Sequence, residues 1–430
     1  MSTWLGIDIG TTAVKVAANK YLLGQTLNGF GTSPNPVNAL ATNAFRAWTD
    51  NNRDFVVNCD LGNKGAQSPT TTASIDTCGA INNNAFGSTV PLATFDPDLL
   101  TGWGHRPSNW EFSGSFQQQL SARMSVDVAY YRRIWQNFPV VDNTLVGASD
   151  FQAFNMTVPT DPRLPNGGGN QLTYYNVNAN KFGQTQNYNT LSDKYGEEYE
   201  HWNGVDVSVS GRMQNGLRFQ AGTSTGHTVA DNCAVIAQVP EMLTNGPANA
   251  GGTLAAGPQL AREFCHLVEP WLTNFKSLVV YTIPKADVQL AVTFRSVPGL
   301  NNTTGNGAGG AQPSGLAANF VATNAYLAAN SNLGRLLSGT TAATQNTTLQ
   351  IVNPDTLYND RDNQLDFRVG KVFKYRGSRA TVNLDLYNLT NASTVFTANQ
   401  AYALAGNVWL TPTSISNPRL MKISFTLDLK

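Results

Sequence analysis

Apolar and polar residues alternate in short runs from about residue 107 onward, and the runs come in pairs joined by tight turns. Alternation with a period of two is the pattern of a β-strand with two different faces. In the run 110–120 the apolar face carries Trp110, Phe112, Phe116 and Leu120. The polar face carries Glu111, Ser113, Gln117 and Gln119. The residues SAR separate this run from 124–134, which alternates again, so the two runs predict a hairpin.

The same pattern recurs along the chain. Three further hairpins are predicted: 203–213 with 217–225, 275–282 with 287–295, and 363–374 with 379–389. The last run, 419–430, predicts a strand with an apolar face of Met421, Ile423, Phe425, Leu427 and Leu429. Each hairpin is tight at one end and opens at the other into a long polar segment, such as 135–200, 229–268 or 299–345. This asymmetry is typical of a transmembrane barrel with short periplasmic turns and long extracellular loops.

Composition favours the same class. Charged residues are 13% of the chain and aromatic residues 10%, whereas soluble proteins are about a quarter charged. Strands that face lipid exclude charge and favour aromatic residues. The 28 basic and 28 acidic residues balance, so the chain lacks the basic footprint of a nucleic-acid-binding protein. We therefore expect an all-β, antiparallel, partial barrel of about a dozen strands.

Aromatic residues cluster near the expected strand ends: Trp110, Tyr130, Tyr131, Trp135, Tyr281, Phe373, Tyr375 and Tyr387. In a membrane barrel such residues form girdles at the two interfaces with water. In any β-sheet they also serve as cross-strand packing pairs. The sequence leaves both interpretations open.

The stretch LGIDIGTTAVKVAANKY, residues 5–21, begins like the phosphate loop of an FGGY-type sugar kinase. Asp8, Gly10, Thr11 and Thr12 fit a turn that places a carboxylate and backbone N–H groups against phosphates and a metal ion. Such a kinase also needs a later Asp-Gly phosphate loop, and the chain contains no Asp-Gly pair. We divide the chain into an atypical leader, 1–11, and a barrel portion, 12–430, with the carbohydrate kinase as the alternative function.

The four cysteines are Cys59, Cys78, Cys233 and Cys265. They lie in polar stretches without predicted strands, in an arrangement that favours two loop disulfides in an oxidising compartment over a metal site. Three pairings are possible, and the sequence does not choose among them.

Other candidate chemistry is weak. Asp50, Asn52, Asp54 and Asp60 have the spacing of a calcium loop, but Phe55 stands where the turn needs glycine, so a solvated turn is favoured. The pair Glu197 and Glu198 is expected to be solvated. The chain carries no G-x-S-x-G, H-E-x-x-H or Walker A motif, so we predict no catalytic residue, no cofactor and no enzyme.

From about Thr12 to Lys430 the chain resembles the C-terminal part of TonB-dependent outer-membrane receptors, in particular the Oar-like type with a carboxypeptidase-regulatory-like domain. The resemblance lies in stretches such as TAVKVAANKYLLGQ, DPDLLTGWGHRPSNWEFS, MSVDVAYYRRIWQNFPVVDN, NQLDFRVGKVF and VNLDLYNLTN. Together these motifs span nearly the whole chain.

The resemblance implies a bacterial outer-membrane transport protein for a bulky nutrient, with a barrel of about 22 strands plugged by an N-terminal domain. It also implies membrane lipid, the TonB complex and the barrel assembly machinery as partners. About a dozen predicted strands and the absence of a plug and a TonB box indicate a fragment. The chain departs from the family at its end, where Leu429 and Lys430 stand instead of an aromatic residue.

Overall fold

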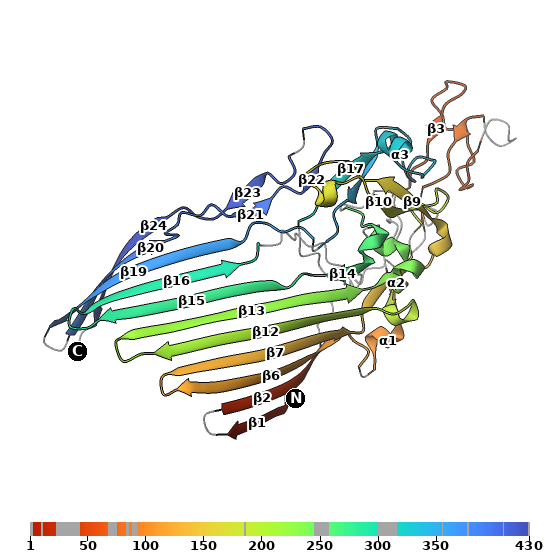
Figure 1. Ribbon diagram of the computed structural model, residues 1–430. Coiled ribbons are helices and arrows are strands. Elements are labelled where there is room, and N and C mark those ends of the chain that lie inside the picture. The colour runs from red at the N-terminus through yellow and green to blue at the C-terminus, as the bar shows by residue number, and fades with distance from the viewer. Residues whose placement is uncertain are drawn as a thin grey trace.

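The structure is a computed structural model dominated by one antiparallel sheet (Figure 1). It describes residues 3–9, 12–22, 44–67, 75–82, 86–87, 93–102, 104–184, 186–244, 258–299, 316–354, 356–375, 378–406 and 408–428. The sheet has 12 strands, and its neighbouring strands follow one another in chain order except for the short side strand β14 (His266–Val268), which pairs with β13. The expectation of an all-β partial barrel of about a dozen strands is confirmed.

The strands of this sheet match the predicted hairpins closely. In order they are β1 (Thr3–Ile9), β2 (Thr12–Leu22), β6 (Ser108–Ser121), β7 (Met124–Gln136), β12 (Tyr199–Arg212), β13 (Leu217–Asp231), β15 (Leu272–Ile283), β16 (Val288–Val297), β19 (Asp362–Tyr375), β20 (Ser378–Tyr387) and β24 (Leu420–Asp428). Among the described residues, β1 pairs only with β2 and β24 only with β20, so the sheet does not close. The two ends of the chain therefore lie at opposite edges of the sheet (Figure 1).

Connections alternate in length along the sheet. The hairpins turn in two to four residues, whereas the connections at the other end are long: 23–107, 137–198, 232–271, 298–361 and 388–419. Because every strand reverses direction, all the tight turns gather at one end and all the long connections at the other, which we call the loop end (Figure 1).

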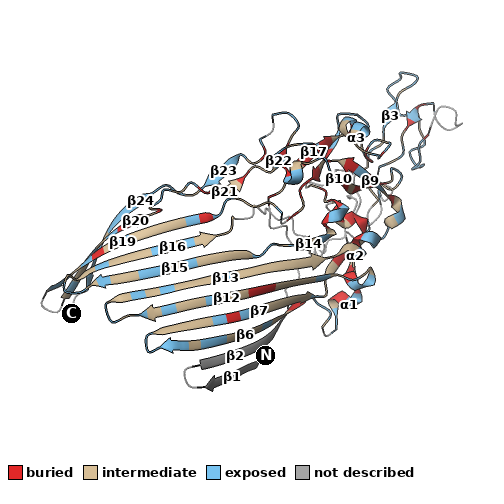
Figure 2. Ribbon diagram, viewed as in Figure 1, coloured by how far each residue is buried: buried red, intermediate tan, exposed pale blue. Residues whose placement is uncertain are grey.

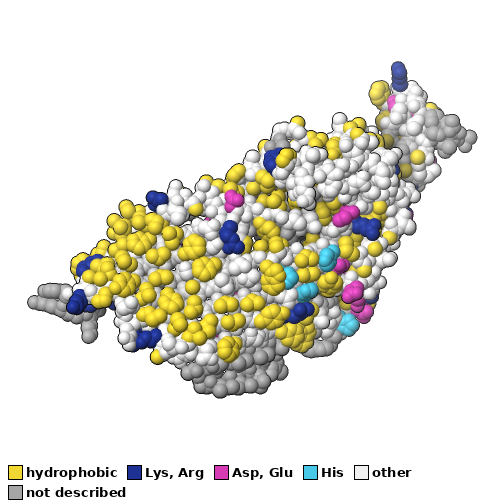
Figure 3. Space-filling model, viewed as in Figure 1, with side chains coloured by type: hydrophobic (Ala, Val, Ile, Leu, Met, Phe, Trp, Pro, Cys, Tyr) yellow, Lys and Arg dark blue, Asp and Glu magenta, His cyan; other side chains and the backbone are white. Residues whose placement is uncertain are grey.

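One face of the sheet, which we call the apolar face, carries apolar side chains from strand to strand. Phe116 lies opposite Val128, and Val128 lies opposite Val207 on the next strand. These side chains are exposed: Phe112, Phe116, Val128, Tyr130, Val207, Val279, Phe373, Val382, Leu384, Met421, Ile423, Phe425 and Leu427. Figure 3 shows this face, with hydrophobic side chains gathered over the strands and few Lys or Arg among them.

The opposite face, which we call the polar face, carries Glu111, Asp127, Arg133, Asp206, Gln220, Thr293, Arg295, Asp366, Arg368 and Asp385. Ion pairs join neighbouring strands here, between Arg133 and Glu111 and between Arg368 and Asp385. The carboxylic residue Asp385 on the polar face is buried, whereas many side chains of the apolar face are exposed. A soluble sheet buries its apolar face instead.

The long connections contain structure of their own. Small sheets form from β5 (Ala93–Phe95), β8 (Pro139–Asn143) and β11 (Asn187–Leu191); from β9 (Phe151–Thr157) and β10 (Gln171–Val177); from β17 (Asn319–Thr323), β18 (Asn346–Gln350) and β22 (Ala401–Tyr402); from β21 (Val395–Ala398) and β23 (Pro412–Ile415); and from β3 (Trp48–Thr49) and β4 (Thr77–Cys78). The buried residues of the described chain concentrate at this end (Figure 2).

A hydrophobic cluster, which we call the loop-end core, joins four of these connections. Its largest fully buried members are Phe154, Met156, Tyr174, Phe320, Leu327, Leu349 and Trp409. The connections, which the sequence shows as long polar segments, therefore also contain a core of their own. Their apolar residues are few and far apart in sequence, so they show no periodic pattern until the fold brings them together.

The helices are α1 (Pro97–Leu100), α2 (Cys233–Gln238) and α3 (Asn324–Asn330), with short 3-10 turns at the loop end such as η5 (Pro240–Leu243) and η6 (Arg262–Cys265). Within the described ranges, every helix is too short to cross a membrane.

Candidate functional site

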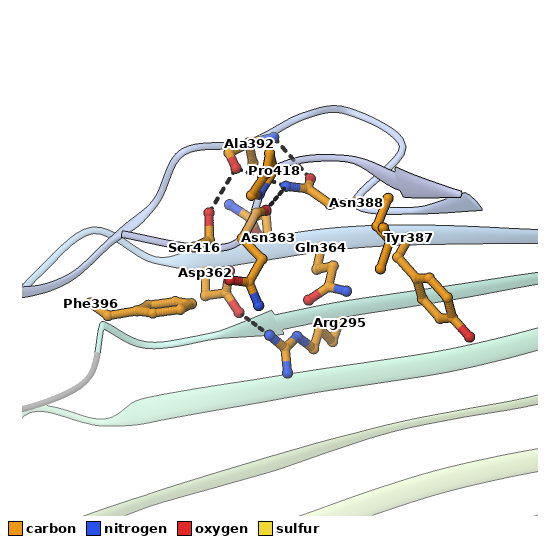
Figure 4. A pocket seen from close by; sticks show the side chains of 12 residues that line it. Arg295, Asp362, Asn363, Gln364, Tyr387, Asn388, Ala392, Phe396, Ser416 and Pro418 are labelled. Atoms are coloured by element: carbon orange, nitrogen blue, oxygen red, sulfur yellow. Dashed lines mark hydrogen bonds and ion pairs between the residues drawn. The ribbon is translucent and has the colours of Figure 1, made fainter. Parts of the chain in front are cut away.

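A pocket of about 270 Å³ lies in the polar face at its loop end, between β16, β19, β20 and the segment that leads into β24 (Figure 4). We call it the wall pocket. Arg295 and Asp362 point toward one another across it, with 2.7 Å between Arg295 Nη2 and Asp362 Oδ2. The Asp362 side chain is only 7% exposed, whereas that of Arg295 is 45% exposed. The carboxylate therefore holds a guanidinium group that remains accessible from the pocket.

The floor of the wall pocket is braced by hydrogen bonds around Asp366. Gln364 Nε2 donates to Asp366 Oδ1 at 2.8 Å, and the Asn388 backbone N–H donates to the same oxygen at 2.8 Å. The second bond ties β19 to the residue that follows Tyr387 at the end of β20.

Asn388 also holds the rim. It has a positive φ of 49°, a conformation that Asn tolerates better than most residues. Its Nδ2 donates to the carbonyls of Ala392 at 2.9 Å and Asn417 at 2.8 Å. Ser416 Oγ donates to the same Ala392 carbonyl at 2.7 Å. One side chain thus ties the connection after β20 to the segment before β24.

A flat aromatic surface lies elsewhere on the polar face, on β7, β12 and β13. The Trp202 ring lies across Gly204 and Gly226, because a Cβ added at these glycines would stand 2.0 Å and 2.5 Å from its ring carbons. The Arg133 guanidinium lies 5.7 Å from the centroid of the Trp135 ring. Aromatic faces and guanidinium groups on a polar wall suit solutes that combine flat and hydrogen-bonding surfaces.

The sequence pointed to none of these wall residues as binding residues. The only available signal was the phase of the alternation, which places Trp202, Arg295 and Tyr387 opposite the apolar positions. Which of the many polar-face residues meet in one pocket depends on the register between strands and on the segment before β24.

The disulfides expected in the loops are present. Cys59 pairs with Cys78 and Cys233 with Cys265, so each cysteine is joined to its nearest neighbour in sequence. The stretches around them are not strandless as expected, because Cys78 lies in β4 and Cys265 directly precedes β14. Both bonds belong to the loop-end connections.

The calcium candidates lie in the described segment 44–67, where their oxygens accept hydrogen bonds within the turn. Asp50 accepts from the backbone N–H of Arg53 at 2.6 Å and of Phe55 at 2.9 Å. Asp54 accepts from the Val56 backbone and from Asn52 Nδ2, and Asp60 from the Gly62 backbone. Within the described ranges, there is no group of three or more His, Cys, Asp or Glu side chains that could hold a metal ion. A calcium role for Asp50, Asn52, Asp54 and Asp60 stays a prediction.

The kinase-like stretch forms the first hairpin of the sheet. β1 pairs with β2 along their full facing length, with Asp8 opposite Ala13, and Thr12 opens β2. Gly10 and Thr11 lie outside the described residues. An edge hairpin of an antiparallel sheet lacks the surrounding α/β structure of a sugar kinase, so the kinase alternative gains no support. The division at residue 11 stays a prediction.

The aromatic residues near the strand ends divide between the two faces. Trp110 and Tyr130 lie toward the loop end of the apolar face, and Tyr281 and Phe373 toward its turn end. Tyr131, Trp135 and Tyr387 alternate onto the polar face. Only the four aromatic residues on the apolar face have the placement of interfacial girdles. The side chain of Tyr375 lies outside the described residues.

Two carboxylates at the loop end are more buried than the sequence suggested. Glu197 is exposed as expected, but burial raises the pKa of Glu198 to about 7. Glu241 in η5 is 2% exposed, and burial likewise raises its pKa to about 7. Glu241 accepts a hydrogen bond of 3.1 Å from the Asn143 backbone N–H and lies beside Asp142. Nothing in the sequence around Glu241 marks it as buried.

An open antiparallel sheet with an exposed apolar face, a charged opposite face, tight turns at one end and elaborate connections at the other has the architecture of an outer-membrane β-barrel wall. No family model matches the chain, and no curated protein is similar to it in sequence.

Solved structures that resemble it include two from Escherichia coli. The outer membrane transporter YddB from Escherichia coli is 10% identical, with a TM-score of 0.37 over 96% of this chain and 38% of that one. The ferric-catecholate import receptor Fiu from K12 E. coli is 10% identical, with a TM-score of 0.27 over 99% and 53%. The chain thus spans between a third and somewhat over half of the length of these structures.

Proposed function

We propose that the chain is part of the barrel wall of a TonB-dependent receptor in the bacterial outer membrane, which takes up a bulky nutrient. The observation that carries this proposal is the reversed polarity of the sheet. Its apolar face is exposed, while ion-paired and partly buried charges line the other face. In a lipid bilayer the apolar face contacts acyl chains and the polar face lines the lumen.

Strand length supports this orientation. A tilted transmembrane strand needs about 9–11 residues, and β6, β7, β12, β13, β15 and β19 have 12–15 residues each. The strands therefore cross the apolar layer and extend beyond it at the loop end. The two loop-end disulfides fit the oxidising, extracellular side of such a membrane.

The lumen side supports a role in solute binding. The wall pocket offers the half-exposed guanidinium of Arg295, and Trp202 offers a flat ring, so the nutrient class that fits is polar and large enough to contact several strands. In this proposal the chain works as part of a longer protein with a plug and a TonB box. The TonB complex supplies energy, the barrel assembly machinery inserts the strands, and no enzymatic step is involved.

Cell fractionation tests the proposed location. An antibody against the chain is expected to detect the protein in the outer-membrane pellet after an alkaline wash that strips peripheral proteins. Its mobility on a denaturing gel is expected to change on boiling, because closed membrane barrels resist detergent at room temperature. Recovery in the soluble fraction, with one mobility before and after boiling, would contradict the proposal.

A further inference from the structure

A row of polar residues marks the loop-end border of the apolar face. Arg132 lies opposite Asn203, which lies opposite His227 on the next strand. His201 occupies the adjacent row, opposite Val229. Between this border and the tight turns, β6, β7, β12 and β13 present no charged side chain on the apolar face. Figure 3 shows histidine side chains toward the loop end, beyond the hydrophobic region.

The basic side chains of this border are held close together. Asn203 is 9% exposed, and its Oδ1 accepts hydrogen bonds from Tyr130 Oη at 2.9 Å and from Arg132 Nη1 at 3.2 Å. The guanidinium of Arg132 and the ring of His227 lie within electrostatic reach of the His201 ring. The border thus gathers three basic groups on adjacent strands, of which the guanidinium always carries charge.

The carboxylates near this border are already engaged. Asp231 Oδ2 lies 2.8 Å from His266 Nδ1, and Glu269 Oε2 accepts from the Thr228 backbone N–H at 3.0 Å. Among the ion pairs of the described residues, none includes Arg132, whereas the adjacent Arg133 on the polar face pairs with Glu111. The border therefore presents positive charge that the described protein does not neutralise.

We propose that Arg132, His201 and His227 bind the phosphate of an anionic membrane lipid whose acyl chains lie along Val205 and Val207 of the apolar face. This inference rests on the proposed function, because it requires the apolar face to contact lipid. The guanidinium group of Arg132 donates charge-assisted hydrogen bonds to phosphate oxygens, and the ring N–H groups of His201 and His227 donate further hydrogen bonds. The apolar surface directly below the border gives a lipid an advantage over a free phosphate ion.

The test compares two adjacent arginines. Arg132→Gln removes the border charge, and Arg133→Gln removes an equal charge on the polar face. The full-length protein that contains the chain is purified in non-ionic detergent, and its affinity for phosphatidylglycerol and for phosphatidylcholine is measured by native mass spectrometry. We expect the wild type to prefer phosphatidylglycerol, Arg132→Gln to weaken that affinity by about fivefold, and Arg133→Gln to leave it unchanged.

Three outcomes would overturn the inference. One is an equal affinity for both lipids in the wild type. Another is an equal loss in both variants, which would show a general charge effect. The last is displacement of the lipid by inorganic phosphate at the same concentration, which would show a simple anion site. In each case the full-length protein still folds in detergent, so the proposed function stands. Failure of the wild type to take up detergent or lipid would count against the proposed function itself.

Discussion

Val279→Arg is expected to destabilise the chain in a lipid bilayer by about 2–4 kcal/mol, the cost of an arginine on the lipid face of a membrane barrel. Val279 lies on the apolar face, opposite Phe219 and Val292. An arginine there must leave water for acyl chains. Urea titration of the full-length protein that contains the chain, folded in phosphatidylcholine vesicles, measures the change in the free energy of unfolding.

Leu278→Arg is the matched control. Leu278 precedes Val279 in β15 and is equally exposed, at 41% against 40%. It lies on the polar face, opposite Gln220 and Thr293. An arginine there faces the lumen, so we expect no change beyond the usual scatter of surface substitutions, about 0.5 kcal/mol. Equal losses at both positions, or the larger loss at Leu278, would reverse the assignment of the two faces.

Glu241→Gln is expected to stabilise the loop end at high pH by about 3 kcal/mol, from a pKa raised from 4.5 to about 7 at 1.36 kcal/mol per unit. The folded protein binds this proton more tightly than the unfolded chain does. The stabilising effect of this bound proton on the folded state is therefore complete below about pH 4.5 and is lost as the pH rises to about 7. Glutamine imitates the protonated acid, because its amide oxygen accepts from the Asn143 N–H and its NH₂ group donates toward Asp142.

Hydrogen exchange of the Asn143 amide measures this effect. After correction for the intrinsic exchange rate, wild type and Glu241→Gln are expected to be equally protected at low pH, and the variant more protected above pH 7. The raised pKa of Glu198 acts in the same direction, so the variant retains part of the pH dependence. Glu197→Gln, an exposed control in the connection 137–198 that also carries Asn143, is expected to match the wild type. A variant less protected than the wild type at high pH would contradict this account of Glu241.

The sheet was predictable because its signal is local. Side chains alternate with a period of two, so the sequence around Trp110 or Met421 predicts which residues share a face. Short turns determine which strands pair. The four predicted hairpins and the last strand agree with the structure to within six residues at their ends. Membrane strands show this pattern clearly because one face must exclude charge.

The loop end was not predictable because its signal is distributed. The loop-end core draws Tyr174, Phe320 and Trp409 from three connections that are far apart in sequence. The wall pocket likewise needs the register of β16, β19 and β20 before Arg295, Asp362 and Tyr387 come together. No window of sequence contains either set.

The first hairpin shows how a short motif depends on its surroundings. Asp8 and Thr12 fit a kinase phosphate loop by residue type and spacing, yet their backbone forms two paired strands at the sheet edge. Glycine and threonine serve a tight hairpin turn as readily as a phosphate turn. The alternation after Thr12 was the more reliable signal, because it extends over more residues and continues into the next strand.

Spin labels along β15 test most directly whether the apolar face contacts lipid. The four native cysteines are all in disulfides, so single cysteines can be introduced and labelled at positions 276–281. In vesicles, labels at Ser277, Val279 and Tyr281 are expected to be accessible to oxygen dissolved in the bilayer and shielded from a water-soluble nickel chelate. Labels at Lys276, Leu278 and Val280 are expected to show the opposite preference. A pattern without alternation, or with the two sets exchanged, would contradict the orientation on which the proposed function depends.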